Sequence, residues 1–330
     1  MLTDSNKFQE GPGGAYGWPS DEAGFNRARL GPPRIAELHL ELSALLSLET
    51  IDVTQEAAAI TLAWSILRQC GLPTFGDIRT KRAENFNNVI PLEIREAVSL
   101  SLETVGWMAY APKPEQFDRA AQLFVRAVAL SPLDLARLEK FAIIAGQIKP
   151  DQIMNLRHDP AKQEQTAIGF AIQATKHIEY ALEEEFGITR EVLNETSGES
   201  INRLISVSDK EVRPYLTRIL RHLSHLHGLQ AYFFKNGVHA SNAIGAGCSA
   251  LQIAGLPRGV AECVHTLQDA LQDHSPSELL GEELPLVISI LDSISKGFHV
   301  KWRLFNNQSA GRRSEELDKL CQILEAKSLE

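Results

Sequence analysis

The sequence has no long apolar run. No window of its 330 residues approaches the roughly 18 uninterrupted apolar residues of a membrane-spanning helix. The most apolar stretch, residues 284–294, is interrupted by Pro285 and Asp292. The N-terminal residues also lack the apolar centre of a secretory signal. We therefore expect no membrane span and a cytoplasmic protein.

Cysteine is scarce, and no two cysteines are close together. The chain has four of them, at positions 70, 248, 263 and 321, and no Cys-x-x-Cys pair. A disulfide scaffold or a zinc ribbon needs closely spaced cysteines, so the sequence argues against both. We expect reduced thiols.

Net positive charge is also missing. The formal net charge is −9, which argues against a protein that coats nucleic acid through a cationic surface, although a local basic patch remains compatible with it. The apolar fraction of 44% and the charged fraction of 23% are typical of a globular protein with a substantial core.

The sequence shows neither the period-two alternation of strands nor an internal repeat. Residues 1–33 are rich in Gly, Pro, Asp and Asn and predict an irregular N-terminal arm. From residue 34 onward apolar residues recur at helical spacing. We therefore predict an all-α fold, a multi-helix bundle of about ten helices over 34–330. This region is expected to be a single domain, with a softer boundary near 148–160.

Proline and glycine predict several helix ends. Pro112 and Pro114 separate a helix over 92–110 from one over 115–130. Helix starts are predicted at three Ser-Pro or Asp-Pro pairs, at 131–132, 159–160 and 275–276. The second of these helices should end at Gly187.

One segment concentrates ionisable side chains. Residues 213–239 hold four of the ten histidines and three arginines, nearly all on what we interpret as one helix. Helical spacing places Arg218, Arg221, His222 and His225 on one side, as a cationic stripe, whereas His227 falls on the apolar face. Imidazole can transfer protons near neutral pH, and guanidinium can stabilise a phosphate, so this segment is the main candidate site.

The motif formed by Arg221, His222 and His227 resembles the signature of the HEPN superfamily. These are all-helical proteins, many of them ribonucleases in bacterial toxin and defence systems. The resemblance implies that Arg221 positions the scissile phosphate and that His227 is the general acid and base, with His222 and His225 in support. It also implies RNA as the partner, a homodimer, and cleavage without metal or cofactor.

The same spacing has a non-catalytic interpretation. Three other Arg/His pairs have similar spacing, 34/39, 218/225 and 258/265, so the pattern is not specific. On a straight helix Arg221 and His227 are about 120° apart. The alternative is a helical scaffold or protein-interaction module in which the stripe is surface or interface and His227 is a core histidine.

A third hypothesis is a metal-dependent helical enzyme. Helical metal sites use Glu residues and Glu-x-x-His pairs from several helices. The candidate ligands here are Glu96, Glu103, His177 and His265. Glu103 lies among apolar residues, and if buried it would need a partner, for which we expect an arginine from another helix.

Residues 245–250 also contain the Gly-x-Gly-x-x-Ala pattern of dinucleotide-binding loops. That interpretation needs a preceding buried strand, and the neighbouring sequence is helical. We interpret the segment as a helix whose small residues allow close helix–helix contact, and we expect no cofactor.

Overall fold

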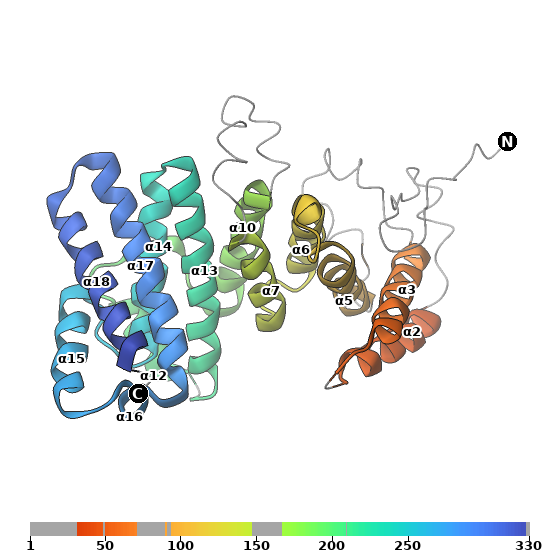
Figure 1. Ribbon diagram of the computed structural model, residues 1–330, viewed down its shortest axis with the longest axis horizontal. Coiled ribbons are helices and arrows are strands. Elements are labelled where there is room, and N and C mark those ends of the chain that lie inside the picture. Colours follow the sequence, from red (N-terminus) through yellow and green to blue (C-terminus); the bar gives the residue numbers. More distant parts are fainter. Residues whose placement is uncertain are drawn as a thin grey trace. The chain divides into compact units, whose positions relative to one another are not determined.

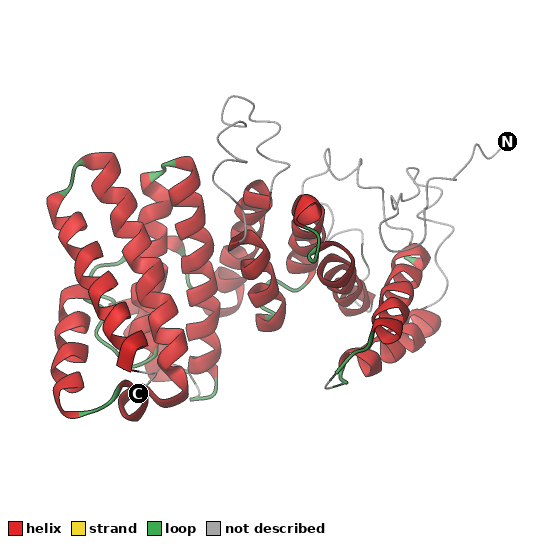
Figure 2. Cartoon of the chain, in the orientation of Figure 1, coloured by secondary structure: helices red, strands yellow, loops and turns green. Residues whose placement is uncertain are grey.

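The computed structural model describes residues 32–48, 50–70, 90, 94–146, 167–208 and 210–327. These residues form helices and no strand, which confirms the all-α prediction (Figure 2). The helices outnumber the ten or so expected. The expected arm (residues 1–33) lies almost wholly outside the described residues, and so does the expected boundary near 148–160.

The chain divides into two compact units. Unit 1 comprises Met1–Ile148 and Leu156–Ala174, and unit 2 comprises Lys149–Asn155 and Thr175–Glu330. The division passes through the helix α10 (Ala167–Phe186), between Ala174 and Thr175. Each unit has its own apolar core.

Unit 1 is a succession of helices that pack on their neighbours in the chain (Figure 1). Its described elements are α2 (Pro32–Leu46), α3 (Val53–Gln69), α5 (Arg95–Thr104), η3 (Val105–Tyr110), η4 (Pro114–Gln116), α6 (Phe117–Leu130) and α7 (Leu135–Gly146). α3 packs on α2 and α5, and α6 packs on α5 and α7.

The helix predicted over 92–110 is not α-helical throughout. Its second part, η3, is a π-helix, and the N–H of Ala111 donates to the carbonyl oxygen of Gly106, five residues back, at 2.9 Å. A β-carbon at Gly106 would lie 3.0 Å from the ring of Phe124 on α6. The missing side chain therefore lets the widened turn approach α6 closely.

The helix predicted to start at residues 131–132 begins later, at Leu135. Asp134, not Ser131, caps it, since the Asp134 carboxylate accepts the N–H of Arg137 at 3.1 Å. Two other predictions are confirmed: α10 ends at Phe186 before Gly187 (φ +66°), and Ser275 and Glu278 form a capping box. The start of α10 predicted at 159–160 lies outside the described residues.

Unit 2 is built on three long helices that pack on one another. Its elements after α10 are α11 (Arg190–Asn194), α12 (Glu199–Val207), α13 (Val212–Phe234), α14 (Gly237–Ile253), α15 (Val260–Asp273), α16 (Pro276–Leu280), η5 (Gly281–Glu283), α17 (Leu284–Phe305) and α18 (Gln308–Lys327). α13, α14 and α17 contact one another, and α18 lies along α17 (Figure 1).

The histidine-rich segment is two helices and not one. Lys235 adopts a left-handed conformation (φ +51°) and ends α13. Asn236 then caps α14, because its side-chain oxygen accepts the N–H of Val238 at 2.8 Å. His239 therefore lies on the first turn of α14, next to the C-terminal part of α13.

The small residues of α14 allow close packing, as predicted. A β-carbon at Gly245 would lie 2.7 Å from the Leu193 carbonyl oxygen, and one at Gly247 would lie 2.4 Å from the side chain of Ile294. The 245–250 segment lies inside this helix and forms no loop. None of the described helices is long and apolar enough to span a bilayer.

Candidate functional site

The helix α13 directs the predicted site residues to different sides. His227 is buried, with 1% of its surface exposed, and its hydrogen bonds go to side chains from α10 and α14. Arg221 instead lies with its Nη1 atom 3.0 Å from Nδ1 of the neighbouring His222. The contacts that hold His227 thus come from Glu179 and His239, which the sequence motif does not include.

Four side chains form the cluster around Glu179. The Nε2 atom of His227 lies 3.0 Å from Oε1 of Glu179, and its Nδ1 atom lies 3.2 Å from Nδ1 of His239. The two imidazole rings are 5.5 Å apart and 30° from parallel. Arg190 donates from Nε to Oε1 of Glu179 at 2.7 Å and from Nη2 to Oε2. We call these residues, from α10, α11, α13 and α14, the Glu179 cluster.

The electrostatics of the cluster favour an ionised carboxylate. Burial acts to raise the pKa of Glu179, but hydrogen bonds from His227 and Arg190 outweigh it and lower the pKa to about 2. Burial, reinforced by the nearby His227, lowers the pKa of His239 to about 4. At neutral pH the cluster therefore contains a carboxylate anion and a neutral His239.

These contacts determine the tautomers when both rings are neutral. An ionised carboxylate only accepts hydrogen bonds, so Nε2 of His227 carries the proton that it donates to Glu179. Nδ1 of His227 then has a lone pair and accepts the N–H at Nδ1 of His239. The remaining lone pair of His239 is on Nε2, and within the described residues this atom has no hydrogen-bond partner. The cluster therefore ends in a basic nitrogen.

Exposure differs sharply along the cluster. The side chain of Glu179 is 11% exposed and that of His227 is 1% exposed, whereas His239 is half-buried. The Arg190 side chain, 52% exposed, covers the outer side of the carboxylate. Of the two imidazoles, only His239 is accessible to a substrate.

The other two histidines of the predicted site, His222 and His225, have lowered pKa values. Burial, with a contribution from the charge of Arg221, lowers the pKa of His222 to about 3. Burial likewise lowers the pKa of His225 to about 4, with a contribution from Lys296 on α17. Both imidazoles are uncharged at neutral pH, so the charges of the predicted cationic stripe are those of Arg218 and Arg221.

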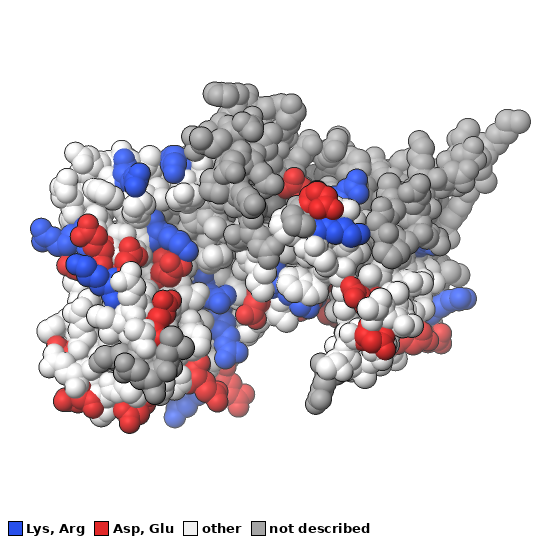
Figure 3. All heavy atoms as spheres, in the orientation of Figure 1, with Lys and Arg blue, Asp and Glu red and all other residues white. Residues whose placement is uncertain are grey.

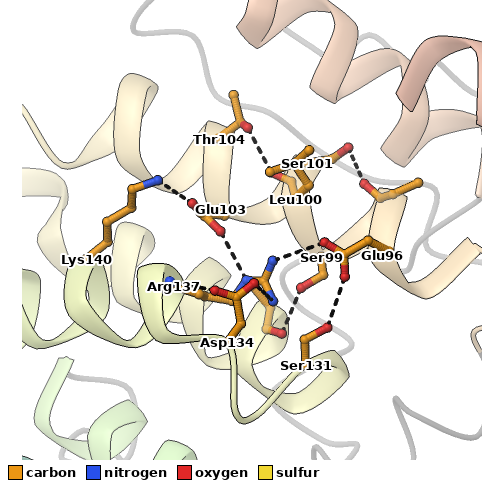
Figure 4. Close-up of polar contacts among 12 residues, drawn as sticks. Glu96, Ser99, Leu100, Ser101, Glu103, Thr104, Ser131, Asp134, Arg137 and Lys140 are labelled. Carbon is orange, nitrogen blue, oxygen red and sulfur yellow. Dashed lines mark hydrogen bonds and ion pairs between the residues drawn. The ribbon is translucent and has the colours of Figure 1, made fainter. Parts of the chain in front are cut away.

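A second polar cluster, in unit 1, surrounds Arg137 (Figure 4). Arg137 is 1% exposed, and its Nε donates to Oε2 of Glu103 at 3.1 Å. Its Nη1 lies 3.2 Å from Asp134 and its Nη2 lies 3.7 Å from Glu96, while Lys140 pairs with Glu103. We call these five residues the Arg137 cluster. It confirms that an arginine from another helix pairs with the buried Glu103.

The proposed metal ligands do not form a metal site where the structure describes them. Glu103 is engaged by Arg137 and Lys140, and His265 lies on an exposed helix surface 3.2 Å from Asp269. No group of three or more His, Cys, Asp or Glu side chains among the described residues is placed to bind a metal ion.

Two cavities of about 240 and 220 Å³ lie in unit 1, beside the π-helix η3. Both are lined by Trp107 and Pro112. Among the described residues that line them, Glu56 is the one ionisable side chain. This composition offers a small apolar space without a pair of catalytic groups.

The sequence identified one imidazole of the Glu179 cluster but not its partners. Glu179 and Arg190 stand outside the histidine-rich segment, in stretches with no recognisable motif. His239 lies within that segment, and only the break at Lys235 turns it toward His227.

Comparison of the chain with protein-family models, curated proteins and solved structures finds no match.

Proposed function

We propose that the protein is a metal-independent ribonuclease in which His239 is the general base. The observation that carries the proposal is the hydrogen-bonded series from the ionised Glu179 through the buried His227 to the half-buried His239. A carboxylate that orients an imidazole and stabilises its protonated form is a common arrangement for proton abstraction. This role differs from the one implied by the HEPN resemblance, where His227 itself would contact the RNA.

The chemical step needs no group beyond the chain and water. Nε2 of His239 takes the proton of an RNA 2′-hydroxyl, and the 2′-oxygen attacks the adjacent phosphorus. The bond from phosphorus to the 5′-oxygen breaks, and that oxygen takes a proton from solvent. The products are a 2′,3′-cyclic phosphate and a 5′-hydroxyl. The imidazolium formed at His239 is stabilised through His227 by the negative charge of Glu179.

The remaining residues position the base. Arg190 holds the Glu179 carboxylate with two hydrogen bonds, and His227 sets the tautomer of His239. Arg221 contacts His222 and takes no part in this step. All four residues of the Glu179 cluster come from one chain, so a homodimer is not required to complete it.

The direct test is RNA cleavage by the purified full chain in the presence of a chelator. We expect the wild-type protein to release cyclic-phosphate ends, and His239→Ala to lower the rate by about 10²–10⁴-fold, the usual contribution of a general base. His265→Ala is the matched control, because His265 is an exposed histidine of the same unit, and it should cleave at the wild-type rate. Equal rates for His239→Ala and wild type, or no cleavage by either, would overturn the proposal.

The positioning role of Glu179 has its own readout. The negative charge of Glu179 acts to raise the pKa of His239. Glu179→Gln should therefore lower kcat and shift the rising limb of the pH–rate profile to lower pH. A purely structural role would lower the amount of folded protein and leave the midpoint of this limb unchanged.

A further inference from the structure

One end of unit 2 combines cations with aromatic rings in two stretches of sequence that lack acidic residues. The sequence has no Asp or Glu from residue 212 to 261, nor from 293 to 314. These two stretches contain the α13–α14 and α17–α18 turns. In a protein of net charge −9, the cations near these two turns therefore have no acidic neighbour in sequence.

The two turns form one surface. The ring of Phe305, at the end of α17, lies against Gly237 at the start of α14, where a β-carbon would be 2.7 Å from Cζ. The charge of Lys235 also acts on His299 of α17. On the face drawn in Figure 3, basic and no acidic side chains appear at the upper end of these helices.

Rings and cations alternate across this surface. The Nζ atom of Lys235 lies 4.4 Å from the centre of the Tyr232 ring, and the guanidinium of Arg303 lies 5.7 Å from the Trp302 ring. Trp302 packs on Gly311, and the exposed Arg312 follows Gly311 on α18. We call the set Tyr232, Lys235, Trp302, Arg303, Phe305 and Arg312 the helix-end surface.

Two rings and two arginines of this surface are exposed to a partner. Phe305 is 65% exposed and Tyr232 is 43% exposed. Neither Arg303 nor Arg312 forms an ion pair with a carboxylate anywhere in the described chain. Rings that can stack on bases, next to cations that can contact phosphates, are the features by which proteins hold single-stranded nucleic acid.

We propose that the helix-end surface binds single-stranded RNA and presents it to His239. Gly237, which contacts Phe305, is two residues before His239 on the first turn of α14. In this arrangement a base stacks on Phe305, Lys235 and Arg303 contact the backbone, and the next linkage reaches Nε2 of His239. The inference rests on the proposed ribonuclease function for its substrate, and it adds how that substrate is held.

An anionic membrane is the other partner that cations and aromatic residues could fit. The tip of the α17–α18 turn argues against it, because Asn306, Asn307, Gln308 and Ser309 are all exposed and polar. A surface that inserts into lipid carries apolar residues at its most protruding point. Here polar residues occupy that point, and the rings lie between cations.

The test measures binding of the full chain to fluorescent 2′-O-methyl RNA of about 12 nucleotides, a length that such surfaces can cover. This RNA lacks the nucleophilic 2′-hydroxyl, so it reports binding without cleavage. We expect Phe305→Ala to weaken binding about tenfold through lost stacking. Arg303→Ala should weaken it and reduce the salt dependence by about one phosphate contact. Arg203→Ala, an exposed arginine of α12, is the control and should bind like wild type.

The outcomes separate the two proposals. His239→Ala should bind this RNA normally while failing to cleave ordinary RNA. Loss of binding in Phe305→Ala and Arg303→Ala without any cleavage by wild type would support the surface and remove the ribonuclease. Normal binding by both variants, with circular dichroism showing that they are folded, would overturn the surface even if wild type cleaves RNA. Binding to phosphatidylserine vesicles and not to RNA would overturn it in favour of a membrane.

Discussion

The two units each contain a buried polar cluster, and the clusters differ in chemistry. In unit 1 a guanidinium and an ammonium neutralise the carboxylates around Arg137, tying α5 to α7. In unit 2 the Glu179 carboxylate accepts hydrogen bonds from Arg190 and from one imidazole, His227, which in turn contacts His239 of α14. Imidazole is the side chain whose charge changes most readily near neutral pH. The comparison teaches that two helical units of one chain can bury clusters of different chemistry, one built from charged side chains alone and one that also contains imidazoles.

The largest loss of stability should come from removing Arg137 from the Arg137 cluster. Arg137→Ala leaves the Glu103 carboxylate buried and partly unpaired, and we expect unit 1 to lose about 3–5 kcal/mol of unfolding free energy. Hydrogen exchange of the α5–α7 peptides in urea measures this loss for unit 1 alone. Arg119→Ala, at an exposed position of α6, is the control and should cost less than about 0.5 kcal/mol. A small loss for Arg137→Ala would mean that the cluster contributes little to stability.

The next effect in size should be a loss of stability of unit 2 on acidification. His222, His225 and His239 have folded pKa values of about 3, 4 and 4, below the usual 6.5. Between pH 6.5 and 4 the unfolded chain therefore binds protons that the folded chain excludes, so unit 2 loses stability as the pH falls through this range. Glu179, with its pKa lowered to about 2, adds a further loss below about pH 4.5.

We expect the buried His222 to account for about 3 kcal/mol of this loss between pH 7 and pH 4, and the partly exposed His225 and His239 each for less. The measurement is hydrogen exchange of the α13 and α14 peptides over that range, compared with the α5–α7 peptides. His222→Leu removes one titrating group and should make the dependence shallower. Equal pH dependence in the two units would contradict the proposed difference between the clusters.

A smaller loss of stability is expected when His227 is removed from the Glu179 cluster. His227→Ala removes one hydrogen bond from Glu179 and one from His239, while Arg190 still neutralises the carboxylate. We expect a cost of about 2 kcal/mol to unit 2 at pH 7, measured by urea denaturation. His227→Gln, which retains a donor, should recover part of the loss. Full stability of His227→Ala would show that the buried imidazole is there for chemistry alone.

The smallest change in stability is expected at an exposed ion pair, in contrast to the buried clusters. Arg203 and Glu199 on α12 form an i,i+4 pair at 3.8 Å, and their side chains are 81% and 70% exposed. Arg203→Ala should change the unfolding free energy of unit 2 by less than about 0.5 kcal/mol. A loss as large as that of His227→Ala would mean that burial does not separate the two kinds of pair.

The helices and several of their start and end points could be predicted, because these depend on residues that are neighbours in sequence. The end of α10 before Gly187 and the capping box of Ser275 and Glu278 follow from local backbone and side-chain chemistry. The π-helix after Thr104 could not be predicted, because it depends on Gly106 meeting Phe124 of another helix. The start of α7 was misplaced because both Ser131 and Asp134 can cap a helix.

The candidate site was predicted only in part. The sequence singled out the histidine-rich segment, and helical periodicity correctly placed His227 on the buried face. It could not supply Glu179, since a glutamate in an amphipathic helix looks like a solvent-exposed residue until its neighbours are known. The motif paired His227 with Arg221, whereas the contacts of His227 come from residues 48 and 12 positions away.

Composition and periodicity by themselves determined that this chain is helical and that four of its ten histidines lie in one segment. Apolar spacing and local capping act over a few residues, so the order of amino acids determines those interactions directly. Only the tertiary structure decided which imidazole meets a carboxylate, which is buried and which reaches the surface. That choice depends on helices distant in the chain, whose packing brings Glu179, His227 and His239 into hydrogen-bonding contact.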